Sequence, residues 1–458
     1  MICDMTTGTP AGQIARFSLP LLIGNILQQF YFMADMAIVS RTISPAAMAA
    51  VGATGAITFL IFGFYFGLTN GFAVITAQRF GAQDFEGVRR SVAISLLLGL
   101  AATAAGMLLS LPTANWLLQL MRTPEDIHEQ ATIYLIALCW GTGATVFYNL
   151  LSCFIRALGD SWTPLWFLAF ATVLNIGLDF LFILTFGMGI AGAAWATVAS
   201  QAISALLCLG YMYRYFPMLR PKWSDWKWDT QWAWRHLRVA LPMALQFSIT
   251  AIGVMVMQQQ INVFGTVTVA AFTVGARIEQ LAVQPMFTIG IAIATFSAQN
   301  FGAGRTDRIR QGVNQATMIS VAWCILSGIA LIVFSRALVG IFLDTDAMPV
   351  ETERAQYYIN MVSSLFIVLG QLFIYRNVLQ GIGRSFFPLL AGAVELVVRI
   401  VASLTLAPLF GYAGAFWATP AAWIGATLLL AVAYFRVLRS REFSRAGGTG
   451  SDLRRSAP

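Results

Sequence analysis

Long apolar stretches dominate the chain and alternate with short polar segments. Twelve of them contain about 20 residues or more, the length that an α-helix needs to cross the hydrocarbon core of a bilayer. Transmembrane helices are predicted over residues 14–40, 47–76, 89–112, 131–155, 163–186, 190–213, 237–264, 268–298, 312–334, 355–378, 386–409 and 413–435. Backbone polar groups must be hydrogen-bonded within each segment in lipid, so the expected fold class is an all-α polytopic membrane protein.

Composition agrees with a chain that has the bilayer as its solvent. Hydrophobic residues make up 58% of the sequence and charged residues only 10%, whereas soluble domains carry roughly 25% charge. The first apolar stretch is too long for the core of a signal peptide and contains Asp35. We therefore interpret it as a retained first helix.

Lysine and arginine residues predict the topology. If the N-terminus is cytoplasmic, nearly all loop Lys and Arg residues fall in inner segments, and the outer segments hold only Arg41, Arg122, Arg336 and Arg354. The positive-inside rule then predicts a multi-pass protein of the bacterial inner membrane with both termini in the cytoplasm. The net charge of +8 is thereby explained as a topology signal, and no nucleic-acid partner is expected.

The segment 214–235 differs from its apolar surroundings. It contains five tryptophans among Lys, Arg and Asp residues: Trp223, Trp226, Trp228, Trp232 and Trp234. Tryptophan favours the headgroup layer, which predicts a cytoplasmic interfacial linker. The residues from Gly447 onward are expected to form a disordered tail.

The chain consists of two similar halves. Three matches recur at offsets of 221 or 222 residues: Leu19-Pro20 with Leu241-Pro242, 78–82 (Gln-Arg-Phe-Gly-Ala) with 299–303 (Gln-Asn-Phe-Gly-Ala), and 191–197 with 413–419. Each half has six predicted spans, so both halves begin inside, and a pseudo-twofold axis along the membrane normal with a cavity between the halves is expected. The predicted division is an N-terminal lobe at 14–213, the linker at 214–235, a C-terminal lobe at 236–436 and a cytoplasmic tail at 437–458.

Two aspartates within spans are the strongest candidates for function, because ionisable groups are costly in a bilayer. Asp35 lies five residues before the outer end of its span, Asp179 eight residues before Gly187, and Thr197 eight residues after Gly189. At 1.5 Å per residue these positions share one layer, roughly 7–12 Å from the outer boundary. Asn175 lies one turn from Asp179 on the same helical face.

Two carboxylates, an amide and a hydroxyl suit a hard monovalent cation such as sodium, and neighbouring desolvated carboxylates can also hold a proton. The alternative is that each side chain makes only structural hydrogen bonds. With two His and five Cys in the chain and no paired Cys motif, no metal cluster is expected. We expect no cofactor apart from the coupling ion.

The remaining charged residues within spans have weaker signals. Glu395 and Arg399 are four residues apart and are predicted to neutralise each other. Arg376 is expected to extend to the headgroups. Arg277 and Glu279 are two residues apart, cannot face each other, and need other partners or a wet cavity.

Two further features of the spans concern the proposed cavity and its movement. Gln258 and Gln259 are candidate polar residues of the cavity, together with Arg277 and Glu279. Pro20 marks either a hinge or a static kink in the first helix.

These motifs resemble those of the multidrug and toxic-compound extrusion (MATE) family over about residues 14–435. The resemblance rests on 28–35 (Gln-Gln-Phe-Tyr-Phe-Met-Ala-Asp), Val51-Gly52, the paired Gln-x-Phe-Gly-Ala loops and 175–179 (Asn-Ile-Gly-Leu-Asp). It implies twelve helices in two lobes and export of organic cations and drugs by antiport with protons or sodium.

Within the family, the resemblance is to the DinF-like branch. That branch implies a coupling site made of Asp35, Asn175, Asp179 and Thr197, with a first helix that can bend at Pro20. Another branch uses acids on the seventh and tenth helices; here the seventh offers Gln258, Gln259 and Gln260, and the tenth has no acid in its apolar stretch.

The leading functional hypothesis is a cation-coupled exporter of amphipathic small molecules, which is not an enzyme and is expected to be a monomer in contact with membrane lipids. A flippase for lipid-linked oligosaccharides is the main alternative, although a pyrophosphate cargo calls for a cationic cavity. An intramembrane aspartyl enzyme is disfavoured, because the nearest match to its Gly-x-Gly-Asp motif, at 157–160, lacks the first glycine.

The topology can be tested with reporter fusions. We expect fusions after Arg220 and after Arg439 to be active with a reporter that works only in the cytoplasm, and inactive with one that works only outside. An external location of either point would contradict both the positive-inside assignment and the parallel repeat.

Overall fold

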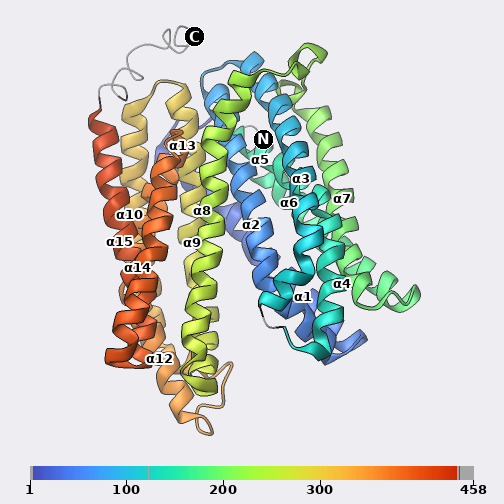
Figure 1. The fold of residues 1–458 in the computed structure, drawn as a ribbon. Helices are drawn as coiled ribbons and strands as arrows, with labels where there is room; N and C mark the ends of the chain where they lie inside the picture. The colour runs from blue at the N-terminus through green and yellow to red at the C-terminus, as the bar shows by residue number, and fades with distance from the viewer. Residues whose placement is uncertain (1–3, 122, 441–442, 444–458) are drawn as a thin grey trace. The chain divides into compact units, whose positions relative to one another are not determined.

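The computed structural model describes residues 4–121, 123–440 and 443. Over these ranges every regular element is a helix (Figure 1). The predicted tail from Gly447 and the outer residue Arg122 lie outside the described residues.

The first half of the chain contains seven α-helices and one π-helical turn. Their bounds are α1 Pro10–Thr42, α2 Pro45–Gly81, α3 Phe85–Leu120, α4 Glu125–Trp140, α5 Thr142–Ala157, α6 Trp162–Phe180, η1 Leu181–Thr185 and α7 Gly189–Tyr215. The segment after α7 contains two short 3₁₀ helices, η2 Pro217–Leu219 and η3 Trp223–Trp226.

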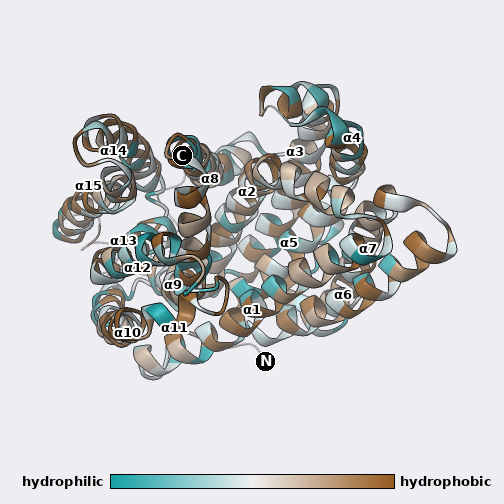
Figure 2. Cartoon of the chain, turned by 90° about the horizontal axis from the view of Figure 1, so that it is seen from below, coloured by the Kyte–Doolittle hydropathy of each residue, from teal (hydrophilic) through white to brown (hydrophobic). Residues whose placement is uncertain are grey.

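The second half repeats this order with one additional short helix, α11. Its helices are α8 Thr230–Asn262, α9 Gly265–Gly302, α10 Thr306–Val333, α11 Ser335–Val339, α12 Pro349–Ser364, α13 Phe366–Gly381, α14 Phe386–Phe410 and α15 Tyr412–Arg439. Apolar residues occupy much of the helical surface, as a lipid environment requires (Figure 2).

The prediction of twelve spans is confirmed. Ten helical stretches are long and apolar enough to cross a membrane, and two bent pairs supply the others: α4 with α5, bent by 48°, and α12 with α13, bent by 51°. The two bent pairs occupy matching positions in the two halves. At the first bend, Gly141 lies against Val198, and an added Cβ would collide with that side chain.

Local sequence explains where helices begin. The Ser44 hydroxyl accepts a hydrogen bond from Ala47 N–H at the start of α2, and Pro45 occupies the first turn, where a missing N–H costs nothing. Asp84 caps α3 by accepting from Gly87 N–H at 2.8 Å. Prolines within helices, among them Pro20 in α1 and Pro242 in α8, remove a backbone hydrogen bond from the helix interior.

The chain packs as two compact units. One contains Asp4 and Leu19–Phe247, and the other contains Met5–Ser18 and the described residues from Ser248 onward. The division therefore falls inside α1 and inside α8, and residues 214–247 group with the first unit. The lobe and linker ranges expected from the sequence describe the repeat rather than this packing, and they stay a prediction.

Glycines allow α2 and the start of α8 to approach closely within the first unit. A Cβ at Gly67 would lie 2.5 Å from the Met243 carbonyl oxygen, and one at Gly71 would collide with the Ala240 backbone. Close backbone approach through small residues is the usual way in which membrane helices associate, because apolar side chains gain little from leaving lipid.

We expect Gly71→Ala to lower stability by about 1–3 kcal/mol, the usual cost of overpacking. The readout is thermal unfolding of the purified protein. Gly55→Ala is the matched control on the same helix, because an added Cβ there meets nothing within 4 Å, and it should unfold at or above the wild-type temperature. Equal unfolding temperatures for the two variants would show that the α2–α8 contact is not tight.

Candidate functional site

The four predicted coupling residues lie on three helices of the first unit. α1 carries Asp35, α6 carries Asn175 and Asp179 one turn apart, and α7 carries Thr197. Asp35 is 4% exposed, and both Asn175 and Asp179 are fully buried. The structure thus buries Asp35, Asn175 and Asp179 and leaves Thr197 half-buried. Burial of two carboxyl groups costs free energy, and apolar packing does not require it.

Asn175 is the link between α6 and α7. With its amide nitrogen oriented toward Asp179, Nδ2 donates to Asp179 Oδ2 at 3.1 Å, and Oδ1 accepts from the Thr197 N–H at 3.3 Å. This orientation follows from the donors and acceptors around the amide, which decide between its two assignments. One side chain thereby positions a carboxylate on α6 against the backbone of α7.

Asp35 and Asp179 form a pair across α1 and α6. Their carboxyl groups lie close enough to interact directly. One oxygen of each, Oδ1, has no hydrogen-bond partner. A carboxylate can only accept, so a bond between two carboxyl groups requires a proton on one of them. The arrangement is that of a carboxylic acid dyad.

No basic side chain compensates this pair within the described residues, since none of their ion pairs includes Asp35 or Asp179. The surroundings are a hydrophobic core that includes Val39 of α1, Leu138 of α4 and Ile183 of η1. Two unit charges 4 Å apart repel by about 4 kcal/mol at an effective dielectric constant of about 20. Ionisation of both carboxyl groups together therefore costs free energy unless a positive charge compensates them.

Two tyrosines complete the site and were not predicted. Tyr31 of α1 lies 3.0 Å from Thr197 through the two hydroxyl oxygens. Tyr134 of α4 is buried and interacts electrostatically with Asp35, Asp179 and Tyr31. Tyr31 is four residues before Asp35, on the same helical face, and this spacing is a signal that the sequence contained. Tyr134 has no such signal, because it comes from another helix.

The backbone changes its winding directly after Asp179. α6 ends at Phe180 and continues as the π-helical turn η1, in which Phe186 N–H donates to Leu181 O at 3.0 Å. π-Helical turns are rare and concentrate at functional sites, because the wider turn re-aims the following side chains. The oxygen donors of the four predicted residues, with the two tyrosine hydroxyls, are of the kind that sodium prefers.

Pro20 is buried within α1, two residues after the division between the packing units. The helix continues through it from Pro10 to Thr42. The predicted hinge or kink at this position stays a prediction.

The four predicted cavity residues of the second unit have different surroundings. Gln258 donates to Asn262 of its own helix at 2.9 Å, and Gln259 and Arg277 are exposed. Glu279 was expected to need a partner from another helix, and the structure identifies it. Tyr358 of α12 donates to Glu279 Oε2 at 2.5 Å. Their assignment to a cavity stays a prediction.

Glu395 is held by two arginines. Arg399 donates to one carboxylate oxygen and Arg376 to the other, both at 2.9 Å. The Glu395–Arg399 pair was predicted correctly. The expectation that Arg376 extends to the headgroups is wrong: it is 8% exposed and bound to Glu395 on α14. A charge-assisted hydrogen bond to a buried carboxylate is stronger than a neutral one, and it keeps Arg376 inside the protein.

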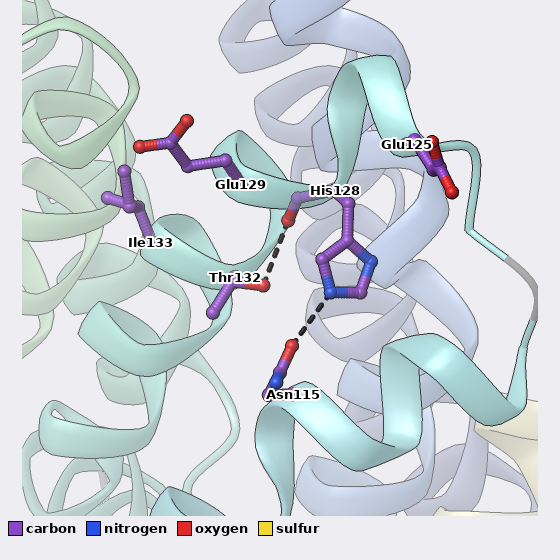
Figure 3. Close-up of a pocket in the computed structure, with 6 residues that line it drawn as sticks. All are labelled: Asn115, Glu125, His128, Glu129, Thr132 and Ile133. Carbon is purple, nitrogen blue, oxygen red and sulfur yellow. Dashed lines mark hydrogen bonds between the residues drawn. The ribbon is translucent and has the colours of Figure 1, made fainter.

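A separate hollow of about 550 Å³ lies where α3 approaches α4, lined by Asn115, Glu125, His128, Glu129, Thr132 and Ile133 (Figure 3). His128 Nε2 is 2.7 Å from Asn115 Oδ1, and the Glu125 and Glu129 side chains point away from the ring. Its lining includes none of the predicted coupling residues, so it is not part of the site.

Comparisons with known proteins show multidrug transporters among the relatives of this chain. Among curated relatives, the chain is 30% identical to the probable multidrug resistance protein YpnP of Bacillus subtilis, over 83% of this chain and 84% of the relative. It is 20% identical to the multidrug export protein MepA of Staphylococcus aureus, over 88% of each chain. Among solved structures, a crystal structure of MATE in the bent conformation has a TM-score of 0.88 at 22% identity, covering 97% of this chain and 98% of that one.

The sequence profile of one family covers both halves of the chain. The MatE profile matches residues 20–181 and 239–405. The first match contains Asp35, Asn175 and Asp179, and the second contains Glu279, Glu395 and Arg399. The chain therefore belongs to the MatE family of multi-pass membrane transporters.

Proposed function

We propose that this chain is a cation-coupled antiporter that exports amphipathic, often cationic, drugs or toxic metabolites by alternating access across the bacterial inner membrane. The observation that carries the proposal is the uncompensated Asp35–Asp179 pair. A buried carboxyl pair that lacks a counter-ion must bind a proton or a cation to remain buried. The chain belongs to a family of transporters, so this requirement is put to use in transport rather than in an enzymatic reaction.

Ion binding can drive a transport cycle only if the ion prefers one state of the protein. A ligand shifts an equilibrium by the difference between its affinities for the two states. A tenfold difference in ion affinity corresponds to about 1.4 kcal/mol. Asp35 and Asp179 lie on different helices, so any movement of α1 relative to α6 changes their separation and therefore the affinity of the pair for the ion.

Pro20 gives α1 a point at which such a movement can occur. Proline removes one backbone hydrogen bond and prevents tight packing of the preceding turn, so bending there costs less than elsewhere in the helix. We infer that the ion-bound and ion-free pairs favour different curvatures of α1. Proton and sodium are both compatible with the oxygen ligands, and the chain is expected to act as a monomer surrounded by lipids.

Two relatives support the choice of cargo, since both YpnP and MepA are described as multidrug proteins. The alternative of a flippase for lipid-linked oligosaccharides needs free cationic groups for a pyrophosphate. Arg376 and Arg399, which are buried in the described part of the second unit, are instead bound by Glu395. This charge balance favours the exporter.

Asp35→Asn tests the site, because an amide has nearly the shape of a protonated carboxyl but cannot ionise to a carboxylate. We expect uphill export by proteoliposomes, under separately imposed pH and sodium gradients, to fall by at least about tenfold, the effect of losing roughly 1.4 kcal/mol of coupling. Asp179→Asn should behave alike. Gln259→Ala, an exposed polar residue of α8, should have a milder effect. Wild-type uphill rates for Asp35→Asn would exclude the assignment.

Competition between ion and substrate is the second expectation. Coupling between two binding equilibria is reciprocal, so protons or sodium should weaken the binding of a cationic substrate by the same factor by which the substrate weakens ion binding. Titrations of purified protein with a fluorescent cation, in separate pH and sodium series, measure this factor and identify the ion. Asp35→Asn should give a flat series. The mechanism is excluded if wild-type affinity is also constant in both series.

A further inference from the structure

We propose that residues 5–8 form an N-terminal strap that positions the start of α1 for transport, and that Arg308 is the principal positioning residue. The strap is held by Gln299, Asn300, Arg305 and Arg308, which we call the strap clamp. All belong to the second packing unit, together with the first turns of α1. The role in transport presupposes the proposed coupling at Asp35, whereas the contacts themselves do not.

The strap clamp binds the backbone of the strap. Four successive carbonyl groups accept hydrogen bonds from it: Met5 O from Asn300 Nδ2 and Arg308 Nη2 at 3.0 and 3.2 Å, Thr6 O from Arg305 Nη1 at 2.8 Å, Thr7 O from Arg308 Nη2 at 3.0 Å, and Gly8 O from Arg308 Nη1 at 2.9 Å. Met5 N–H donates to Gln299 Oε1 at 2.9 Å. The bonds from Arg305 and Arg308 are charge-assisted and therefore stronger than neutral ones. They hold the backbone of the strap against the strap clamp.

The strap clamp is itself prearranged. Gln299 and Asn300 are fully buried at the end of α9, and Arg308 Nε donates to Asn300 Oδ1 at 3.0 Å. The Met5 side chain is also fully buried. Gln299 and Asn300 are the first two residues of the Gln-x-Phe-Gly-Ala motif in the second half, so the strap accounts for a repeated motif that the coupling site leaves unexplained.

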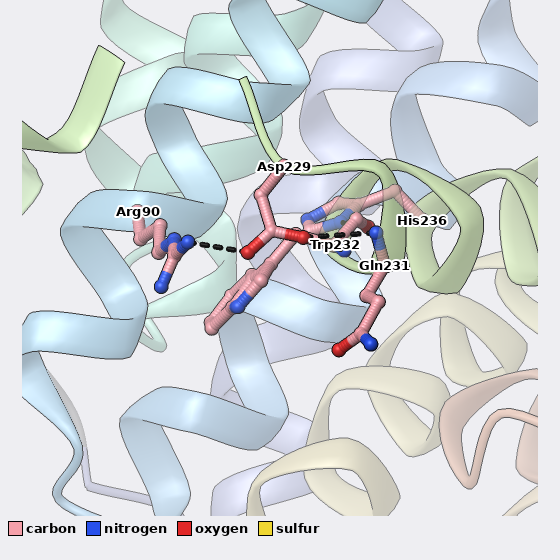
Figure 4. Close-up of polar contacts among 5 residues, drawn as sticks. All are labelled: Arg90, Asp229, Gln231, Trp232 and His236. Atoms are coloured by element: carbon pink, nitrogen blue, oxygen red, sulfur yellow. Dashed lines mark hydrogen bonds and ion pairs between the residues drawn. The ribbon is translucent and has the colours of Figure 1, made fainter. Parts of the chain in front are cut away.

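The matching motif of the first half holds a matching segment. Arg79, the counterpart of Asn300, lies 4.9 Å from the Trp232 ring, and Arg90 lies 5.1 Å from the same ring. Arg90 also pairs with Asp229 at 2.5 Å (Figure 4), and Arg89 pairs with Asp225 at 3.5 Å. Asp225 and Asp229 lie directly before α8 and Trp232 lies in its first turn, so these contacts hold the start of α8 as the strap contacts hold the segment before α1.

Each repeat therefore binds the chain at the start of the first helix of the other repeat, or just before it. This reciprocal pattern explains why the two packing units divide inside α1 and inside α8, and not at the boundary between the two sequence repeats. In α1 the division comes just before Pro20, and Asp35 lies 15 residues beyond Pro20, about 22 Å along a helix. If the start of α1 is fixed, a displacement at Asp35 bends the helix at its most compliant point, Pro20. If the start is free, it moves together with the rest of the helix and no bend results.

Arg308→Ala tests the strap directly. We expect uphill export to fall by about tenfold, the effect of losing even one charge-assisted hydrogen bond from a two-state equilibrium. Substrate affinity and its dependence on pH and sodium should be unchanged, because the variant leaves Asp35 and Asp179 intact. Arg308→Lys should recover only part of the rate, since an ammonium group cannot bridge several carbonyls as a guanidinium does.

The matched control is Arg310→Ala. Arg310 is on the same helix and donates to Leu438 O at 3.0 Å, away from the strap, so its export should remain at the wild-type level. A chain that starts with a new initiator Met before Thr9 lacks the strap altogether. It should match Arg308→Ala, and combining the two changes should cause no further loss.

Accessibility of the strap gives a readout that does not depend on transport. With the native cysteines replaced, a cysteine at position 5 should react slowly with a thiol reagent in the wild-type background and at least about tenfold faster with Arg308→Ala, by the same loss of binding. Fast labelling together with wild-type export would overturn the positioning role, as would an altered ion dependence of substrate binding. Absence of gradient-driven export in the wild type would instead refute the proposed function.

Discussion

The constraint on which the rest of the structure depends is the cost of charge in a medium of low dielectric constant. A carboxylate buried among apolar helices needs a basic partner, several hydrogen-bond donors or a bound cation. Asp35 and Asp179 have one amide donor and each other. Their site is therefore incomplete by itself, and an incomplete site that a mobile ion completes is what an ion-driven transporter requires.

The second unit meets the same constraint differently. Glu395 is shared by two guanidinium groups, and Glu279 accepts from the Tyr358 hydroxyl. These acids have partners within the protein, and breaking such a buried pair would leave an uncompensated charge that costs several kcal/mol. The two halves, although repeated in sequence, thus differ: the first buries a carboxyl pair that has no basic partner among the described residues, and the second gives its acids arginine or tyrosine partners.

Sequence predicted the properties that follow from local periodicity and depth. Hydropathy identified the spans, and the four-residue spacing placed Asn175 beside Asp179. It failed where a partner comes from elsewhere in the chain: Arg376 was expected in the headgroups because Glu395 is 19 residues away on another helix, and Tyr134 had no signal at all. Tyr31 was visible at four residues from Asp35 and was overlooked. The strap could not be predicted either, because its clamp binds backbone carbonyls, which every sequence has.

The position of the proposed ion site on α1 follows from what that helix connects. A carboxylate on a helix packed within one unit along its whole length would change only local contacts when it binds an ion. α1 instead has its first turns in the second unit and Asp35 in the first, with a proline near the division. The repulsion between two carboxylates acts over a few ångströms, but a helix is stiff between compliant points, so a small displacement at Asp35 becomes a change of angle at Pro20. In the proposed mechanism the strap fixes the start of α1. A displacement at Asp35 then bends the helix at Pro20, whereas without the strap the whole helix would move.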